Sequence, residues 1–435
     1  MGLFQQWIDG FKPQEPVIDE EADKSLRSVS TDSKQEKDYD VKDQAAVVEQ
    51  RPAVYHTEEA NLKQALRGRH IQFIALGGSI GTGLFIGSSS PLSDGGPGSL
   101  ILGFLLISIL VITVVFALGE LASVLPVTGA FSTYATRFID PSWGFAMGYI
   151  YWIGWITPLP LEAIAAAMVI QYWDPHETVP RGVWVAISLS IVLFINIFGV
   201  RGYGEFEFAA SFIKVIGCIG FIICAIVIDC GGAPAGKYLG AHTWHDPGSF
   251  NNGFKGFCSV FTTAAFAFAG TELVGLAAAE TKDARRQLPR ACKQVVFRVL
   301  LFYILSLFMI SLIVPSNDPH LEGGEYDTRT SPFVLAIKIG GIKYLPSIFN
   351  AIILISTLSV GNASVYAASR TLLALANHGQ APKIFRYVDR NGRPLPAVIL
   401  SLLFGPLGFL IYSASETEVF VRIIALCTYR SRTGS

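Results

Sequence analysis

Long apolar runs, which begin near residue 70 and recur along the rest of the chain, constrain the fold more than any other feature. Several extend for about 20 residues with few charges, the length of an α-helix that crosses a hydrocarbon layer roughly 30 Å thick. Only 15% of the 435 residues are charged, whereas soluble domains contain about 25%. The net charge of −1 gives no reason to expect a nucleic-acid partner. The sequence therefore predicts an all-α protein that lies in a lipid bilayer.

Nine runs qualify as membrane spans. They are Ile71–Ile86, Leu100–Leu125, Trp143–Tyr172, Val183–Gly199, Phe212–Ile228, Phe257–Leu276, Val295–Val314, Leu345–Ala368 and Leu395–Ile411. The preceding segment 1–69 is polar and predicts a disordered tail. Most Lys and Arg of the later loops fall on the side of this tail, and the other side holds only Arg181, Lys237, Lys255, Arg329, Lys338 and Lys343. Cytoplasmic loops carry the excess of positive residues, so we expect a cytoplasmic N-terminus.

The first span is rich in glycine, which costs about 1 kcal/mol per helical position relative to alanine. We therefore expect an interrupted helix. Unwound backbone at membrane depth is tolerated where it is buried or lines a cavity, and its N–H and C=O groups can hold an anion and an ammonium group. This makes candidate substrate-binding residues of Ser79, Ile80, Gly81, Thr82 and Gly83. Close helix packing through small-xxx-small spacing is the alternative. A nucleotide-binding loop is disfavoured, because no strand precedes the glycines.

A second interruption is expected in the sixth span, where the small-residue stretch Ala265–Glu272 ends in a carboxylate. Phe266, Ala269 and Gly270 are its candidate substrate-binding residues. Breaks in the first and sixth spans are typical of two inverted five-helix repeats whose half-helices meet at the bilayer midplane. The sequence thus predicts a transporter fold with broken helices 1 and 6.

Three ionisable residues within the spans, Glu162, Lys214 and Glu272, are candidates for proton coupling, because charges at this depth are costly and usually functional. Lys214 lies two residues into its predicted span, so reaching for the membrane interface is the alternative. For Glu162, the alternative is a structural hydrogen bond to helix backbone.

At this point the motifs resemble a known family. The run Arg69–Phe85 resembles the first helix of fungal amino acid permeases, in the amino acid–polyamine–organocation superfamily. Gly119–Leu121, Phe266–Glu280 and Val360–Asn362 are similar to later motifs of that family, and the segment that ends at Glu280 is most like general amino acid permeases. The resemblance covers about residues 60–420. It implies proton-coupled amino acid uptake by alternating access across a fungal plasma membrane.

The resemblance also implies roles within the substrate site. The N–H groups of Thr82 and Gly83 would hold the substrate carboxylate, and the carbonyls of Ser79, Phe266 and Ala269 would receive its ammonium group. Phe266 would also lie over the bound side chain as a gate.

For the proton, the resemblance implies three candidates. Lys214 matches a fifth-helix lysine whose ammonium group takes the place of a sodium ion. Glu162 matches a third-helix position near the substrate, and Glu272 matches a sixth-helix glutamate.

The domain boundaries follow from the spans, and the resemblance ends after Phe420. We expect a first repeat over 70–229, an external loop over 230–255 and a second repeat over 256–420. Residues 421–435 contain three arginines and are too short to span, so they form an atypical tail. The expectation is a truncated chain whose C-terminal helices are missing.

The leading functional hypothesis is a proton/amino acid symporter of broad specificity. An amino acid sensor that signals through its tail, and a non-functional truncated permease, are the alternatives. Lysines in the tail would suit a ubiquitin ligase adaptor. We expect neither an enzyme nor a cofactor or metal site, since the six cysteines form no CxxC pair.

Overall fold

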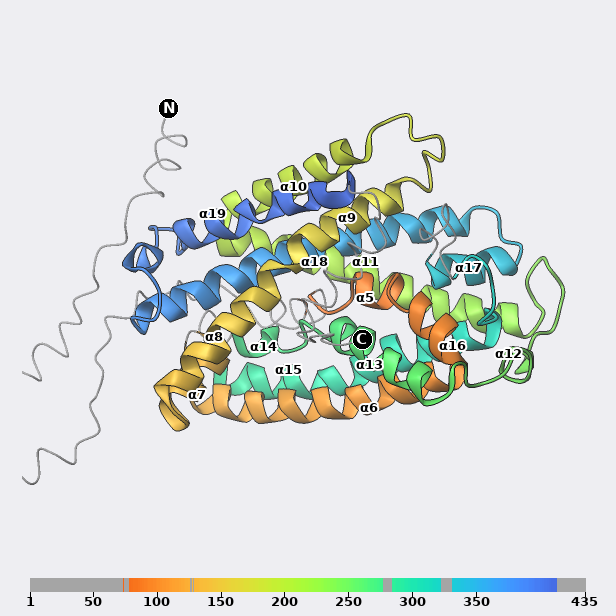
Figure 1. The fold of residues 1–435 in the computed structure, drawn as a ribbon, viewed down its shortest axis with the longest axis horizontal. Coiled ribbons are helices and arrows are strands. Elements are labelled where there is room, and N and C mark those ends of the chain that lie inside the picture. Colours follow the sequence, from red (N-terminus) through yellow and green to blue (C-terminus); the bar gives the residue numbers. More distant parts are fainter. Residues whose placement is uncertain are drawn as a thin grey trace, which may run out of the picture.

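The computed structural model describes residues 73, 78–125, 127, 129–276, 284–321 and 331–412. Within these ranges the chain forms helices and loops without a β-strand (Figure 1). The predicted tail over 1–69, the residues that follow Leu276 in the Phe266–Glu280 motif and the segment 421–435 lie outside the described residues.

The helices follow one another along the chain as two groups. The first group is α5 (Thr82–Phe85), α6 (Ser89–Val124), α7 (Ala130–Phe138), α8 (Pro141–Ile156), α9 (Pro158–Ile170), α10 (Arg181–Ile197) and α11 (Gly199–Asp229). The second is α12 (His242–His245), α13 (Gly253–Ala267), α14 (Leu273–Leu276), α15 (Ala284–Arg298), η2 (Val299–Leu305), α16 (Ser306–Ile313), α17 (Pro332–Ile339), α18 (Leu345–Asn377), η3 (Lys383–Arg386), α19 (Leu395–Leu403) and η4 (Gly405–Tyr412).

Several helical segments have the length and apolarity of membrane spans. Among the described residues, the long ones are Ser89–Val124, Pro141–Ile170, Gly202–Asp229, Arg285–Ile313 and Leu345–Asn377. Arg181–Ile197 and Leu395–Leu410 are shorter apolar helices. The long helices lie roughly along one direction, with α7 at one end of the bundle and α12 and α17 at the other (Figure 1). This arrangement is that of a multi-pass membrane protein, while the nine spans and the two repeats stay predictions.

Burial separates central helices from peripheral ones. In the most apolar window of each helix, 78% of the residues of α8–α9 and 67% of those of α18 are buried, against 28% for α6. The exposed face of α6 carries Leu102, Leu106, Ile109 and Leu110. In water such an apolar face would be unfavourable, so α6 is suited to contact lipid, and α18 and α9 form the centre of the bundle.

Proline and glycine explain the breaks outside the site. The predicted span Trp143–Tyr172 is divided at Thr157, because Pro158 begins α9 and a proline has no N–H for the preceding turn. Within α6, Gly96 has a φ of +81° next to Pro97. The freed N–H of Gly98 donates to the carbonyl of Ser249 at 2.8 Å.

The fifth predicted span is too short at its N-terminal end. It was expected to begin at Phe212, but α11 begins at Gly199 and has 31 residues. Apolarity identifies the part of a helix that faces lipid, whereas the first turns of α11 carry polar residues that pack against α18. Lys214 is consequently near the middle of the helix and fully buried. The structure therefore excludes the alternative in which Lys214 reaches for the interface.

Candidate functional site

Two short, interrupted helices form the centre of the candidate site. Helix α5 has only four residues and begins after Gly81, whose backbone is extended at φ −147° and ψ −153°. The second interruption separates α13 from α14, and Gly270 between them has a φ of +99°. A left-handed conformation of this kind is readily adopted only by glycine. Both breaks predicted from sequence are thus present.

The two breaks are in direct backbone contact. A Cβ atom on Gly83 would lie 2.6 Å from the Cα of Ala267, and one on Gly270 would lie 2.3 Å from the carbonyl oxygen of Gly78. Glycine is required here because no side chain fits between the two segments. The packing alternative is therefore correct for these glycines, and it coexists with a site in which unwound backbone is buried.

Tyr303, which sequence reasoning did not identify, joins the two breaks. Its hydroxyl lies 2.8 Å from the carbonyl oxygen of Ser79 and 3.0 Å from that of Ala267, in position to donate to either. The side chain is 1% exposed and its ring stacks on Phe268. One of the carbonyls expected to receive a substrate ammonium group thus already accepts a hydrogen bond from the protein, although a carbonyl oxygen has a second lone pair.

Tyr303→Phe is expected to lower the free energy of unfolding by about 1–3 kcal/mol, because it leaves two buried carbonyls without this donor. Thermal unfolding of the detergent-solubilised protein would measure the change. Tyr344→Phe is the matched control, since Tyr344 is 82% exposed. Equal stability of the two variants would contradict the role of the Tyr303 hydroxyl.

Glu162 contacts the first break from α9. Its Oε1 accepts a hydrogen bond of 2.7 Å from the hydroxyl of Thr82, and its side chain is 2% exposed. Its Oε2 is buried and has no hydrogen-bond partner among the described residues. Glu162 is therefore bonded to a side chain of the break and not to its own helix backbone. The second lone carboxylate oxygen leaves capacity for a proton or a ligand.

The other predicted residues border the same place. The carbonyl of Ile80 accepts a hydrogen bond of 2.6 Å from Ser356 of α18. Phe266 is 7% exposed, and its ring contacts the position where a Gly83 Cβ would lie. Ala269 is exposed and belongs to the turn after α13, where its N–H donates to the carbonyl of Phe266. All the predicted substrate-binding residues thus belong to the two breaks or, in the case of Glu162, contact one of them.

Glu272 has a local structural partner. Its Oε2 accepts a hydrogen bond of 3.0 Å from the N–H of Gly270, and the hydroxyl of Tyr151 lies 3.5 Å from its Oε1. The carboxylate therefore stabilises the left-handed turn of the second break. Its role in proton coupling stays a prediction.

Lys214 belongs to a buried chain of hydrogen bonds between α11 and α18. Its Nζ donates to the hydroxyl of Ser359 at 2.8 Å, and that hydroxyl donates to Oε1 of Glu207 at 2.5 Å. All three side chains are 0% exposed. Sequence reasoning missed Glu207, because it fell before the predicted start of the fifth span. Its spacing of seven residues from Lys214, two helical turns on one face, was the available signal.

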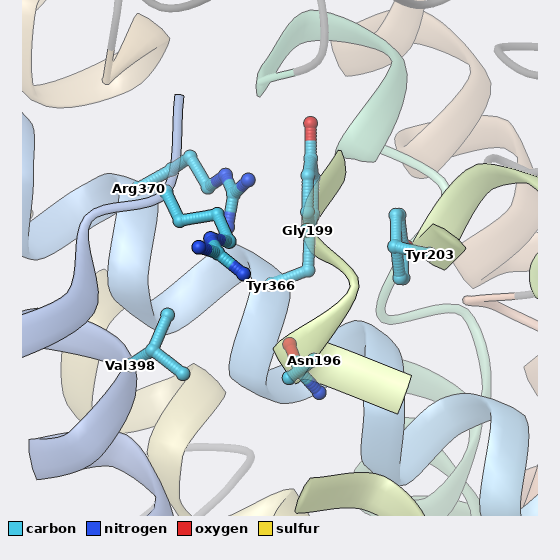
Figure 2. A pocket seen from close by; sticks show the side chains of 7 residues that line it. Asn196, Gly199, Tyr203, Tyr366, Arg370 and Val398 are labelled. Carbon is cyan, nitrogen blue, oxygen red and sulfur yellow. The ribbon is translucent and has the colours of Figure 1, made fainter. Parts of the chain in front are cut away.

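A cluster of aromatic and cationic side chains lies further along the same two helices. The rings of Tyr203 and Tyr366 stack at 4.3 Å with an interplanar angle of 4°, and the guanidinium of Arg370 lies 4.2 Å from the Tyr366 ring centre. Figure 2 shows the Tyr366 ring with Tyr203 on one side and Arg370 on the other. With Arg393 and Asn196, these residues line a small cavity.

The cavity is held by a buried ion pair. Asp389 Oδ2 accepts a 2.6 Å hydrogen bond from Arg393 Nε, and both residues are at most 3% exposed. Arg393 also donates to the carbonyl of Ile197, at the end of α10. Among the described residues, no group of three or more His, Cys, Asp and Glu side chains is arranged to hold a metal ion.

Comparison with known sequences identifies relatives over most of the chain. The profile of the amino acid permease family matches residues 70–430. The general amino-acid permease GAP2 of Candida albicans is 52% identical over 372 residues, 85% of this chain and 63% of its own length. GAP1 of Saccharomyces cerevisiae is 50% identical over 376 residues, 85% of this chain and 62% of its own. The chain thus spans less than two thirds of the length of these two relatives.

Solved structures share the fold at low sequence identity. MhsT in complex with L-phenylalanine has a TM-score of 0.58 and 14% identity, over 82% of this chain and 85% of its own. Mhp1, a nucleobase-cation-symport-1 family transporter with bromovinylhydantoin bound, has a TM-score of 0.55 and 14% identity, over 84% of this chain and 77% of its own. These similarities establish a transporter fold and carry no information on the substrate of this chain.

Proposed function

Because the chain belongs to the amino acid permease family, we propose that it takes up amino acids across a membrane by proton-coupled alternating access. The observation that carries the proposal is the contact of the two interrupted helices at Gly83 and Gly270 in the interior of the bundle. Half-helix termini that meet inside a membrane fold are suited to hold a small zwitterion.

The substrate would bind through main-chain groups. As the first residues of α5, Thr82 and Gly83 have N–H groups without partners in their own helix, and these suit a carboxylate. The carbonyls of Ser79, Phe266 and Ala269 would receive the ammonium group. Because these main-chain groups recognise what all amino acids share, the arrangement favours broad specificity, with Phe266 against the variable side chain.

The position of Glu162 suggests how proton and substrate binding are linked. A carboxylate bound at Thr82 would lie close to the Glu162 carboxylate, which is bonded to the same residue. Two like charges in a buried site repel each other strongly. We therefore expect a proton to bind near Glu162 and Lys214 when the amino acid binds, with Glu272 as a further candidate carrier.

The remaining expectations concern topology and location. We propose two inverted repeats, 70–229 and 256–420, in a fungal plasma membrane with the N-terminus in the cytoplasm. The positive residues of the loops support this orientation. On this assignment the α18 end at Asn377 faces the cytoplasm, and the polar N-terminal segment would be available to a ubiquitin ligase adaptor.

Uptake by proteoliposomes that contain the full 435-residue chain would test the function. With the outside more acidic, labelled amino acids should accumulate, and a protonophore should abolish the accumulation. A sodium gradient at equal pH should not replace the proton gradient. Equal accumulation with and without the pH gradient would contradict proton coupling. The absence of both net flux and exchange for every amino acid tested would contradict transport itself.

A further inference from the structure

Three buried side chains form a continuous and oriented hydrogen-bond chain between α11 and α18. Lys214 donates to Ser359 at 2.8 Å, and Ser359 donates to Glu207 at 2.5 Å. Both bonds point the same way, from the lysine to the carboxylate. A hydroxyl that accepts on one side and donates on the other is the arrangement that passes a proton. The second oxygen of Glu207 is buried without a hydrogen-bond partner among the described residues, so this carboxylate has capacity to take a further proton or water.

The helix faces that carry this chain continue toward the cavity. Tyr203 precedes Glu207 by four residues on α11, and Tyr366 follows Ser359 by seven residues on α18. Such spacings place residues on one face of a helix. The two tyrosine rings stack face to face where α11 and α18 meet. They therefore stand one to two turns beyond Glu207, between it and the cavity that Arg370 and Arg393 line (Figure 2).

We propose that Glu207 receives the transported proton from Lys214 through Ser359 and releases it to the cytoplasm when the Tyr203–Tyr366 stack opens. This inference rests on the proposed function, which it deepens by naming a route for the proton. In the transfer, the Lys214 ammonium gives one proton to Ser359 Oγ while the Ser359 hydroxyl proton moves to Glu207 Oε1. Lys214 becomes a neutral amine, Glu207 a neutral carboxylic acid, and Ser359 is again a hydroxyl.

The surroundings favour such a transfer. The step converts a buried ion pair into two neutral groups, so no net charge is created in a region that solvates charge poorly. The titratable groups around Lys214 are Glu207 on its own helix, Glu162 on α9 and Cys218 one turn further along α11. Glu162 lies on the substrate side and Glu207 on the cavity side, so the lysine stands between a carboxylate that contacts the site and one that leads away from it.

Removal of the acceptor should uncouple proton movement from substrate binding. In proteoliposomes with an acidic exterior, Glu207→Gln should lower the initial rate of pH-driven uptake about 100-fold, the scale of a lost proton-transfer group. Substrate-induced thermal stabilisation of the purified variant should persist, because Glu207 does not contact the two breaks. Ser359→Ala should behave like Glu207→Gln, whereas Ser359→Thr, which retains a hydroxyl, should recover uptake.

Two control variants remove similar groups outside the relay. Glu205→Gln removes a carboxylate from an exposed position on the same helix, and Ser364→Ala removes a hydroxyl that bonds only within α18, to the carbonyl of Gly361. Both should transport like the unchanged chain. Uptake by Glu207→Gln at the unchanged rate would overturn the relay. So would loss of substrate stabilisation together with uptake, because that pattern indicates a structural role.

A second measurement tests the relay without transport. Infrared difference spectra of the purified full chain, recorded between acidic and alkaline pH, should contain a C=O band of a protonated carboxylic acid that is absent in Glu207→Gln and present in Glu205→Gln. Retention of every carboxylic-acid band in Glu207→Gln would overturn the proposal. Failure of the unchanged chain to accumulate amino acids would instead count against the proposed function, and the spectra would still decide whether Glu207 takes up a proton.

Discussion

Replacement of Gly270 by alanine is expected to abolish transport. The residue has a φ of +99°, and an added Cβ would lie 2.3 Å from the carbonyl oxygen and 2.5 Å from the carbonyl carbon of Gly78. The left-handed backbone costs about 1–2 kcal/mol for an L-residue, and overpacking adds about 1–3 kcal/mol. Because both clashing atoms are main chain, no rotamer change relieves them. The two breaks would separate, and uptake should fall below about 1% of its unchanged rate, the scale of roughly 3 kcal/mol.

The measurement is uptake in proteoliposomes together with substrate-induced thermal stabilisation, and both should be lost. Gly220→Ala is the control, since a Cβ there meets no atom within 4 Å. Alanine also favours the helical conformation at this position of α11. Wild-type uptake by Gly270→Ala would show that close contact between the breaks is not needed for binding or for transport.

Replacement of Lys214 by methionine is expected to have the largest effect on stability. The lysine is fully buried beside the fully buried Glu207, to which Ser359 connects it. Removal of one partner of a buried ion pair costs about 3–5 kcal/mol, because the other charge stays in the interior without compensation. Thermal or denaturant unfolding of the purified protein would measure the loss. pH-driven uptake should disappear as well, since the relay loses its donor.

A double variant separates the charge effect from the packing effect. Lys214→Met combined with Glu207→Gln leaves no uncompensated charge at the pair and should recover about half or more of the lost stability, as neutral replacements of buried ion pairs often do. It should not recover pH-driven uptake. Lys343→Met, at an exposed position, is the control and should leave stability unchanged. If the double variant were less stable than Lys214→Met, the ionic interpretation of this pair would be wrong.

The positions of the two breaks could be predicted from the sequence because their cause is local. Glycine lacks a Cβ and disfavours helix in any context, so the runs around Gly81 and Gly270 indicated interrupted helices before any packing was known. Membrane character was predictable for a similar reason, since the length of an apolar run is set by bilayer thickness. The substrate-binding role of these residues is still a prediction.

Other features depended on residues that are far apart in the chain. Thr82 and Glu162 are 80 residues apart, and Lys214 and Ser359 are 145 apart. Glu207 was missed because hydropathy ended the predicted span at Phe212, whereas α11 continues to Gly199. A polar helix face that is buried against another helix looks, in sequence, like the polar flank of a span.

The sequence by itself determined that this chain crosses a membrane through long apolar helices and that two of them are interrupted, because apolarity and glycine act through each residue's own chemistry. Only the tertiary structure decided which groups share a buried environment. The contact between Gly83 and Ala267, the donor position of Tyr303 and the alignment of Lys214, Ser359 and Glu207 follow from helix packing. Packing depends on the shapes of whole faces and therefore cannot be read from one segment at a time.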